Sequence, residues 1–487
     1  MVTVDNEMGK IATAFASVLI ALVLAVSGVA QDTDQAKMDA LQRRLTDLES
    51  QLQTVVRELA ALKAAASEIS SAKNNAASDP STATAHSPSK PPTTPPVKKD
   101  LGIDIGSARL TPYGTIYFNA FGNAGPTNNI DVPLWATPAG SGNFSATVRQ
   151  TRLGLKLEGA KVGDARLGAV VEADFFGGSP GIGIGENFGV VRLRLANVRL
   201  DWEKTSLTIG QDWMVFAPQN PTSLAAAAIP QMTSAGNTWA RLPQVKLQRK
   251  IGDHLTLQAA VLAPQTGDSP TSATFLLQAN SGAASLVPFL QSRISFGDNN
   301  WFGTAKPGVI ALSGHYGRSR VFTGAANIEN DIDSVGVAAD WSFPMAKRVS
   351  FAGEAFFGRN LGGFQAGIFQ GYNNEFAYRV GTTLLSGGVR SIATRGGWMQ
   401  IGFTPPVWND RLGIFGSVGI DDPDDGDLVT LSNRDWRTQN FAVAGNFIYR
   451  FTPQFSIAGE IRRFQTNYFR TPRRNANHLN LAAAYSF

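Results

Sequence analysis

Basic side chains occur on one face of several extended segments between residues 152 and 246, where Arg152 and Lys156 are four positions apart and Arg192 and Arg194 are two apart. Alternate residues of a strand point to the same face, so these cations should line one side of a sheet, together with several carboxylates. Such a face either pairs its charges internally or keeps a positive field that attracts anions. The cations are Arg152, Lys156, Arg166, Arg192, Arg194 and Lys246, and the carboxylates are Glu158, Glu172, Asp174 and Asp212.

Other motifs offer weaker chemistry. Residues 421–427 hold five aspartates, but they lack the spacing and the closing glutamate of a twelve-residue calcium loop. The GIGIG run at 181–185 precedes no helix start, so it does not indicate a nucleotide site. Four scattered histidines form no catalytic or metal-binding spacing, and the absence of cysteine excludes thiolate metal ligands. We therefore predict no catalytic residue, no metal and no cofactor.

The segments that carry these charges are predicted to be transmembrane strands. At the C-terminus, one face is apolar and ends in aromatic residues, as a lipid-facing barrel strand requires, while the other is small or polar. The same alternation recurs upstream, for example at 153–157, 167–175 and 335–343. The apolar face holds Leu479, Leu481, Ala483, Tyr485 and Phe487, and the opposite face holds His478, Asn480, Ala482, Ala484 and Ser486.

The lengths of the connections alternate along residues 101–487. Short turns are expected near 160–164, 203–205, 251–253, 344–348 and 452–454, and long loops near 122–144, 177–189, 217–243, 264–286, 317–330, 360–391, 421–436 and 464–477. Alternation of this kind is typical of outer-membrane barrels, with short turns in the periplasm and long loops outside. We predict an all-β transmembrane barrel of about 16 antiparallel strands, with a bulge near Ala196.

The third long loop is expected to form a constriction. In general porins this loop folds into the lumen, and here residues 217–240 contain no ionisable side chain. An acidic loop would favour cations, whereas a neutral loop beside a basic wall favours anions. The side chains that we assign to the constriction are Trp213, Phe216, Trp239 and Arg241.

Three segments precede the barrel. Residues 1–30 resemble a cleaved secretory signal peptide, with an uncleaved anchor as the alternative. Residues 31–70 predict a coiled coil, and residues 71–100 form a linker rich in Pro, Ser and Thr. Within 31–70, an arginine at 44 and a glutamate at 49 resemble the signature of trimeric coiled coils. The heptad positions are Met38, Leu41, Leu45, Leu48, Leu52, Val55, Leu59, Leu62, Ala66 and Ile69.

The composition limits the possible partners. The net charge is +5, charged residues make up 17% of the chain, and no dense Lys/Arg run is interleaved with aromatic residues. These features give no support to nucleic-acid binding. A barrel of this kind would instead contact outer-membrane lipid and lipopolysaccharide.

Five sequence blocks have the character of a known family: 111–119 (TPYGTIYFN), 152–159 (RLGLKLEG), 170–177 (VVEADFFG), 192–198 (RLRLANV) and 210–213 (GQDW). In these blocks the chain resembles the DcaP-like family of outer-membrane porins. This resemblance implies a signal peptide, a periplasmic coiled coil, a homotrimer of 16-stranded barrels, and diffusion of small anionic solutes such as dicarboxylates. It also implies that Arg152, Arg166, Arg192 and Arg194 line the constriction. The run from Ala225 to Ala228 matches no substrate site of that family.

The expected function is therefore passive diffusion through the outer membrane of a Gram-negative-type bacterium, with the coiled coil in the periplasm. Two alternatives stay open. The barrel could be an anchor that connects the membrane to the cell wall through the coiled coil, or it could be an outer-membrane hydrolase that acts on lipid.

Overall fold

The structure is a computed structural model that describes residues 101–178, 189–266, 278–324 and 328–487. The expected signal peptide (1–30), coiled coil (31–70) and linker (71–100) lie outside the described residues, so these assignments stay predictions. Among the described residues, no helix is both long enough and apolar enough to cross a membrane.

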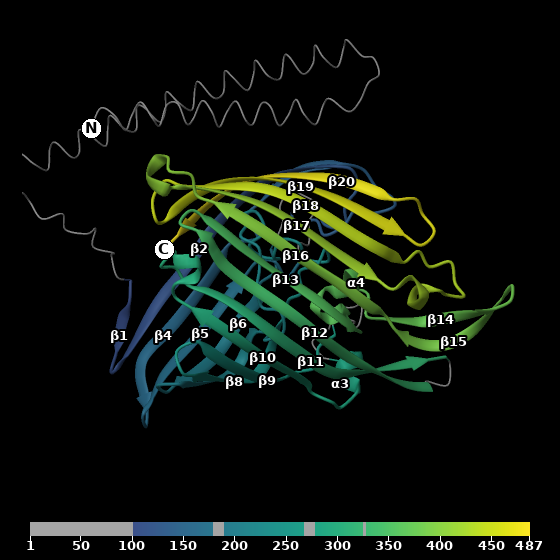
Figure 1. Cartoon of the computed structure of the whole chain (residues 1–487), viewed down its shortest axis with the longest axis horizontal. Coiled ribbons are helices and arrows are strands. Elements are labelled where there is room, and N and C mark those ends of the chain that lie inside the picture. Colours follow the sequence, from purple (N-terminus) through teal and green to yellow (C-terminus); the bar gives the residue numbers. More distant parts are fainter. Residues whose placement is uncertain (1–100, 179–188, 267–277, 325–327) are drawn as a thin grey trace, which may run out of the picture. The chain divides into compact units, whose positions relative to one another are not determined.

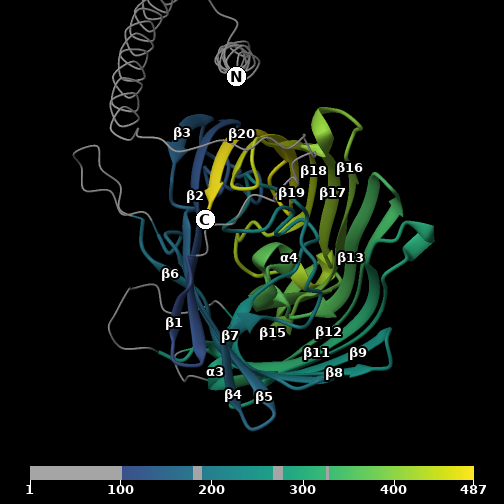
Figure 2. The same ribbon diagram turned by 90° about the vertical axis from the view of Figure 1, so that its left-hand side faces the viewer.

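Sixteen antiparallel strands in the described part of the chain form a closed barrel, as Figures 1 and 2 show. Each strand pairs with the next one around the wall, and the last pairs with the first, so no edge is left unpaired. The predicted antiparallel β-barrel and its strand number are confirmed. The strands are β2 (Ala108–Ala124), β4 (Arg152–Val162), β5 (Ala165–Asp174), β6 (Arg192–Asp201), β7 (Thr205–Trp213), β8 (Arg241–Ile251), β9 (Leu255–Leu262), β10 (Phe289–Asp298), β11 (Gly308–Thr323), β12 (Ile328–Ala346), β13 (Val349–Arg359), β16 (Ala393–Phe403), β17 (Leu412–Pro423), β18 (Arg437–Arg450), β19 (Phe455–Tyr468) and β20 (Arg474–Ser486).

The seam of the barrel joins the two ends of this domain. Strand β2 pairs with β20 from Thr115 opposite Ser486 onward. Gly114 and Phe487 exchange backbone hydrogen bonds of 3.3 and 3.1 Å, and inside the barrel the Asn119 amide donates to Asn480 at 3.1 Å. The terminal aromatic residue therefore contributes directly to closure.

Short and long connections gather at opposite ends of the barrel, which we call the short-turn end and the long-loop end. Two predicted long loops, at 317–330 and 464–477, are wrong. There the strands continue to Thr323 and Tyr468 and resume at Ile328 and Arg474. In the first hairpin, cross-strand ion pairs continue the ladder beyond the apolar pattern: Arg318 pairs with Asp333 at 3.1 Å and Arg320 pairs with Asp331 at 2.7 Å.

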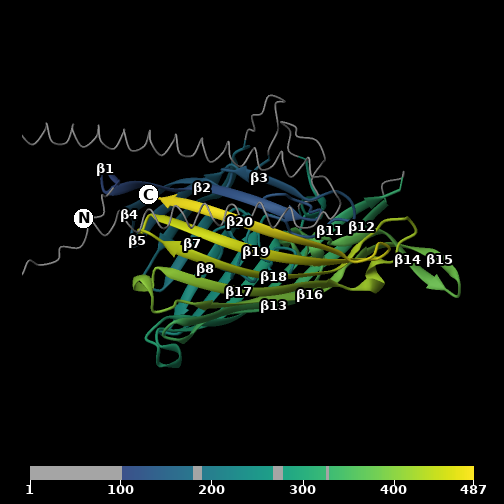
Figure 3. The same cartoon turned by 90° about the horizontal axis from the view of Figure 1, so that it is seen from above.

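Several smaller helices and strands lie outside the set of sixteen barrel strands. Strands β14 (Tyr372–Val380) and β15 (Thr383–Ser391) form a separate hairpin that projects from the long-loop end (Figures 1 and 3). Two short strands add to β2, namely β1 (Ile103–Ile105) and β3 (Asn143–Thr147). The short helices are α3 (Ser281–Ala284), η1 (Trp301–Gly303), η2 (Gly362–Phe364), α4 (Ala366–Phe369), η3 (Trp408–Asp410) and η4 (Asp425–Leu428).

A bulge interrupts strand β6, two residues before the position predicted for it. Glu172 pairs with Leu195 and Ala173 pairs with Leu193, so Arg194 has no partner of its own in the ladder. The bulge shifts the alternation of the strand: Leu193 and Val198 both face outward, with 49% and 45% exposure, although they are five residues apart. Arg194 itself stays on the inner side with Arg192, where it forms an ion pair with Glu172 at 2.7 Å.

Candidate functional site

The loop between β7 and β8, residues 214–240, lies inside the barrel and is called here the inserted loop. Its backbone amides donate to side chains of strands across the lumen. Val215 N–H donates to Gln291 on β10 at 2.9 Å, Thr222 N–H to Gln400 on β16 at 2.8 Å, and Thr238 N–H to Glu354 on β13 at 2.8 Å. The loop therefore crosses the interior, where it narrows the passage.

The run from Ala225 to Ala228 docks this loop against the wall between β2 and β6. The Gln150 amide donates to Ala225 O at 2.9 Å, and its oxygen accepts from the amides of Ala227 and Ala228, each at 2.9 Å. Methyl side chains allow the backbone to approach the wall this closely. The sequence offered the alanine run as a signal, but it gave no indication that Gln150 would bind it.

Four arginines converge on the same stretch of loop backbone. Arg152 donates to Ala227 O at 3.1 Å, and Arg192 donates to Ala228 O at 2.9 Å. Arg194 and Arg241 also reach Ala228 O, each at 3.5 Å. We call Arg152, Arg192, Arg194 and Arg241 the arginine cluster.

Two carboxylates partly neutralise this cluster. Asp174 pairs with Arg192 at 2.6 Å and with Arg194 at 2.8 Å, and Glu172 pairs with Arg194 at 2.7 Å and Arg152 at 3.5 Å. Four positive and two negative charges leave a formal charge of 4 − 2 = +2. Arg194 is only 3% exposed, so it holds the loop and the two acids together, whereas Arg152 and Arg192 keep 26% and 25% exposure.

Arg241 has no carboxylate partner among the described residues. Its guanidinium carbon lies 4.8 Å from the centre of the Trp213 ring and 5.1 Å from that of Trp239, and one of its terminal nitrogens is buried without a hydrogen-bond partner. The two indoles hold the cation by cation–π attraction and leave its charge uncompensated. Three of the four predicted constriction residues are thus brought together.

Phe216, the fourth, lies elsewhere. Its side chain is fully buried, with ring centres 6.1 Å from His315 and 6.3 Å from Phe364. It belongs to an apolar cluster that fastens the start of the inserted loop to the inner wall, with members on β8, β9, β10, β12 and β13. Phe216 is therefore a packing residue at the base of the loop.

The remaining predicted charges lie closer to the short-turn end. Lys156, Glu158, Lys246 and Asp212 line an inner cavity of about 540 Å³. They form pairs, Lys156 with Glu158 at 2.7 Å and Lys246 with Asp212 at 2.5 Å. Arg166 is exposed near the turn that follows β4, opposite Asp201 in the ladder and apart from the arginine cluster.

Carboxylates on the opposite wall were not identified from the sequence. Glu354 accepts from the backbone and hydroxyl of Thr238, and Glu460 accepts from Ser223 and Gln231. Both are almost fully buried, so they position the inserted loop. Inward positions on β13 and β19 predict a polar lumen, but not contacts with a loop more than 100 residues away.

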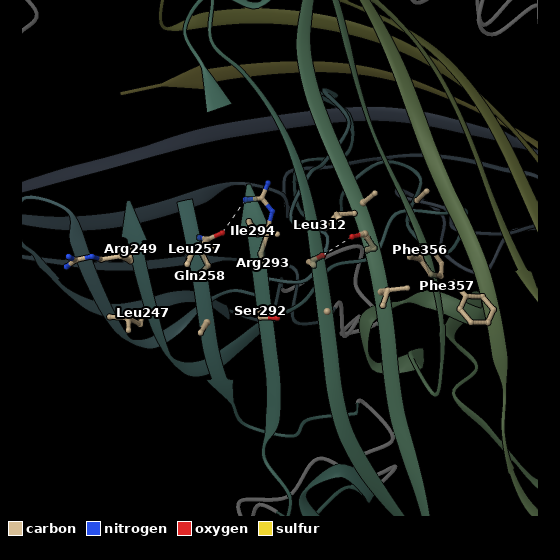
Figure 4. A pocket seen from close by; sticks show the side chains of 17 residues that line it. Leu247, Arg249, Leu257, Gln258, Ser292, Arg293, Ile294, Leu312, Phe356 and Phe357 are labelled. Carbon is tan, nitrogen blue, oxygen red and sulfur yellow. Dashed lines mark hydrogen bonds between the residues drawn. The ribbon is translucent and has the colours of Figure 1, made fainter. Parts of the chain in front are cut away.

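A larger depression of about 980 Å³ lies on the outer wall (Figure 4). Exposed apolar side chains of β8 to β13 line it, including Leu247, Ile294, Leu312 and Phe357. The inner faces of β12 and β13 are covered there by the cluster that contains Phe216. This depression is therefore separate from the arginine cluster.

No family model matches the chain, and no curated protein matches it in sequence. Among solved structures, the outer membrane channel DcaP of Acinetobacter baumannii is 20% identical, with a TM-score of 0.59, and the match covers 79% of this chain and 99% of that one. OmpF of Salmonella typhi, in a complex with daunomycin, is 12% identical, with a TM-score of 0.48, over 79% of this chain and 100% of that one. An anion-selective porin from Comamonas acidovorans is 11% identical, with a TM-score of 0.48, over 78% of this chain and 100% of that one.

The DcaP match is a likeness of fold. It supports the resemblance that the sequence blocks indicated, because the two barrels agree over almost the whole length of the solved channel. The described part of this chain thus has the fold of a DcaP-like outer-membrane channel.

Proposed function

We propose that the protein is an outer-membrane porin through which small hydrophilic solutes diffuse passively, and that it favours anions such as small carboxylates. The observation that carries this proposal is the arginine cluster. It has a formal charge of +2 and faces an inserted loop that contains no ionisable residue between 217 and 240.

The geometry suits transient attraction of anions. Arg241 supplies an uncompensated charge, while Arg152 and Arg192 present partly exposed guanidinium groups already shared with Glu172 and Asp174. Fixed positive charge raises the local concentration of anions in a narrow passage. Because the neighbouring acids weaken each contact, an anion can leave as readily as it enters, which passive conduction requires.

The surroundings of the barrel follow from its outer wall. Leu153, Leu155 and Ile209 are among the exposed apolar side chains, and they would face lipid acyl chains. Trp301, Phe302 and Phe343 form an aromatic group near the short-turn end, as expected at a membrane interface. The long-loop end would then meet lipopolysaccharide, and residues 31–100 would lie in the periplasm.

Conductance measurements test this function against its alternatives. The full-length protein in a planar bilayer should give a large, steady ionic current that favours anions in a salt gradient. A barrel that conducts no ions would support the anchor hypothesis instead. Hydrolysis of bilayer lipid by the purified protein would support the enzymatic alternative and contradict the present proposal.

We expect a homotrimer in which residues 31–70 contribute to assembly. The unbroken heptads should make a synthetic 31–70 peptide helical and oligomeric, because single helices with a narrow apolar seam gain stability by packing together. Circular dichroism and sedimentation would measure both properties. A control peptide with Leu45, Leu52 and Leu59 changed to Ser should be unfolded and monomeric, and a monomeric natural peptide would contradict the expectation.

A further inference from the structure

A second pocket, of about 290 Å³, opens between the loops at the long-loop end. It lies among η2, the turn before β14 and the residues that precede β18, away from the arginine cluster. We call it the loop pocket. The side chains used here are Asn360, Phe369, Tyr372, Asn374, Arg434 and Trp436, and the backbone of Gly362, Gly363 and Gly371 forms part of its wall.

The loop that forms this wall is closely packed and conformationally constrained. A Cβ atom at Gly362 would lie 2.6 Å from the Gly371 nitrogen, so the two chain segments touch at backbone distance. Gln365, Ile368 and Phe369 have φ values of 71°, 52° and 64°, a region that costs energy for residues with a side chain. Arg437 fixes the loop by donating to Ile368 O at 2.9 Å. Strain held in this way marks a pre-formed site.

Two hydrogen-bond donors of the loop pocket are unused. The Arg434 guanidinium lies over the Trp436 ring, with its carbon 3.7 Å from the ring centre, and no described carboxylate lies within ion-pair distance. Partial burial lowers the pKa of Arg434, and the more distant Glu375 offsets this only in part. Trp436 is 1% exposed, and its indole nitrogen has no hydrogen-bond partner within the described part of the chain.

We propose that the loop pocket binds a monosaccharide that carries one carboxylate, a uronic acid. The single stacked guanidinium matches one carboxylate, which it can grip with two parallel hydrogen bonds. The indole N–H and the side chains of Asn360 and Asn374 suit neutral hydroxyl groups. The rings of Phe369 and Tyr372 offer flat apolar surface for the C–H face of a sugar, and the cavity is at the small end of the range for ligand pockets.

The loop pocket is connected to the inserted loop, because Trp239 N–H donates to Phe364 O in η2 at 3.1 Å. A uronate held there would be concentrated at the long-loop end, beside a wall that contacts the inserted loop. This role in uptake rests on the proposed porin function, whereas binding in the pocket does not.

The test uses the full-length protein in planar bilayers, with sodium glucuronate added on the side of the long loops. Glucuronate should interrupt the current, and the concentration that gives half of the maximal effect should rise at least about tenfold in Arg434→Gln, because a hydrogen-bonded charge is lost. Trp436→Phe keeps an aromatic ring, although a smaller one, and removes the N–H, so it should weaken the effect roughly threefold. Arg395→Gln is the matched control, because Arg395 is 76% exposed and pairs with Asp422 on the outer side.

Unitary KCl conductance equal to that of the natural protein shows that each variant is folded. The proposal that the loop pocket binds a uronate would be contradicted if Arg434→Gln had the same affinity for glucuronate as the natural protein. It would also be contradicted if glucose bound as tightly as glucuronate. Normal KCl conductance of the natural protein without any effect of glucuronate would also contradict uronate binding, but it would agree with the porin function. If no current is seen at all, the porin function fails, and calorimetric titration of glucuronate into the detergent-solubilised protein still decides whether the pocket binds it.

Discussion

Replacing Arg241 with glutamine should lower the preference for chloride over potassium about tenfold. One unit charge about 6 Å from a passing ion in water attracts an anion and repels a cation by ~0.7 kcal/mol each, and both effects are lost. Arg241 is the member of the arginine cluster without a carboxylate partner in the described chain, so its charge is the least compensated of the four. The reversal potential across a KCl gradient measures the change. The difference should shrink as KCl rises from 0.1 to 1 M, since the screening length falls from about 10 Å to about 3 Å.

Arg249→Gln is the matched control for this variant. Arg249 lies on the same strand, β8, but follows the outward-facing Leu247 by two residues and donates to Thr205 at 2.7 Å. Its loss should leave selectivity unchanged. A cation-selective natural protein, or an Arg241 variant with unaltered selectivity, would mean that Glu172 and Asp174 already neutralise the cluster. Arg194 is unsuitable for this test, because removing a partner from its buried ion pairs typically costs about 3–5 kcal/mol of stability.

Alanine at position 419 should loosen the inserted loop and produce a larger, noisier conductance. A Cβ atom there would lie 2.1 Å from the Ala235 carbonyl oxygen, where the loop rests on β17. Overpacking of this kind costs about 1–3 kcal/mol, which is enough to populate an undocked loop and widen the passage. Single-channel recording measures both the mean current and its fluctuations.

The same strand provides the control for this second variant. A Cβ atom at Gly416 meets no atom within 4 Å, so Gly416→Ala should conduct like the natural protein. If Gly419→Ala also conducts normally, the tip of the inserted loop does not limit the current. An increase in both variants would instead indicate a general effect of alanine on the wall.

The barrel could be predicted because its two faces meet different solvents. Alternation of the kind seen at Leu153 and Leu155 therefore runs through the spanning strands and fixes their number. The ends of the strands could not be placed in the same way. Beyond the membrane both faces are polar, and the ladder of β11 and β12 continues on ion pairs such as Arg320 with Asp331, which resemble loop residues in the sequence.

The charged residues of the candidate site could be recognised in the sequence, but the ion pairs and loop contacts that they form could not. The period-two pattern places Arg192 and Arg194 on one face with Glu172 and Asp174, but it does not show that Arg194 would pair with both acids while Arg192 pairs with Asp174. The path of the inserted loop depends largely on backbone amides that donate to Gln150, Gln291 and Glu354. Every residue type has such an amide, so no pattern of side chains could reveal the path.

The seam between β2 and β20 has a consequence for how the protein is made. The last strand completes the wall by pairing with the first, and the two partners Asn119 and Asn480 are 361 positions apart. Loop closure over such a separation is slow and gains nothing until the final residues are present. A ribosome that stops before Arg474 would therefore release a chain with two open edges, and biogenesis of this barrel is an all-or-none event that waits for the last strand.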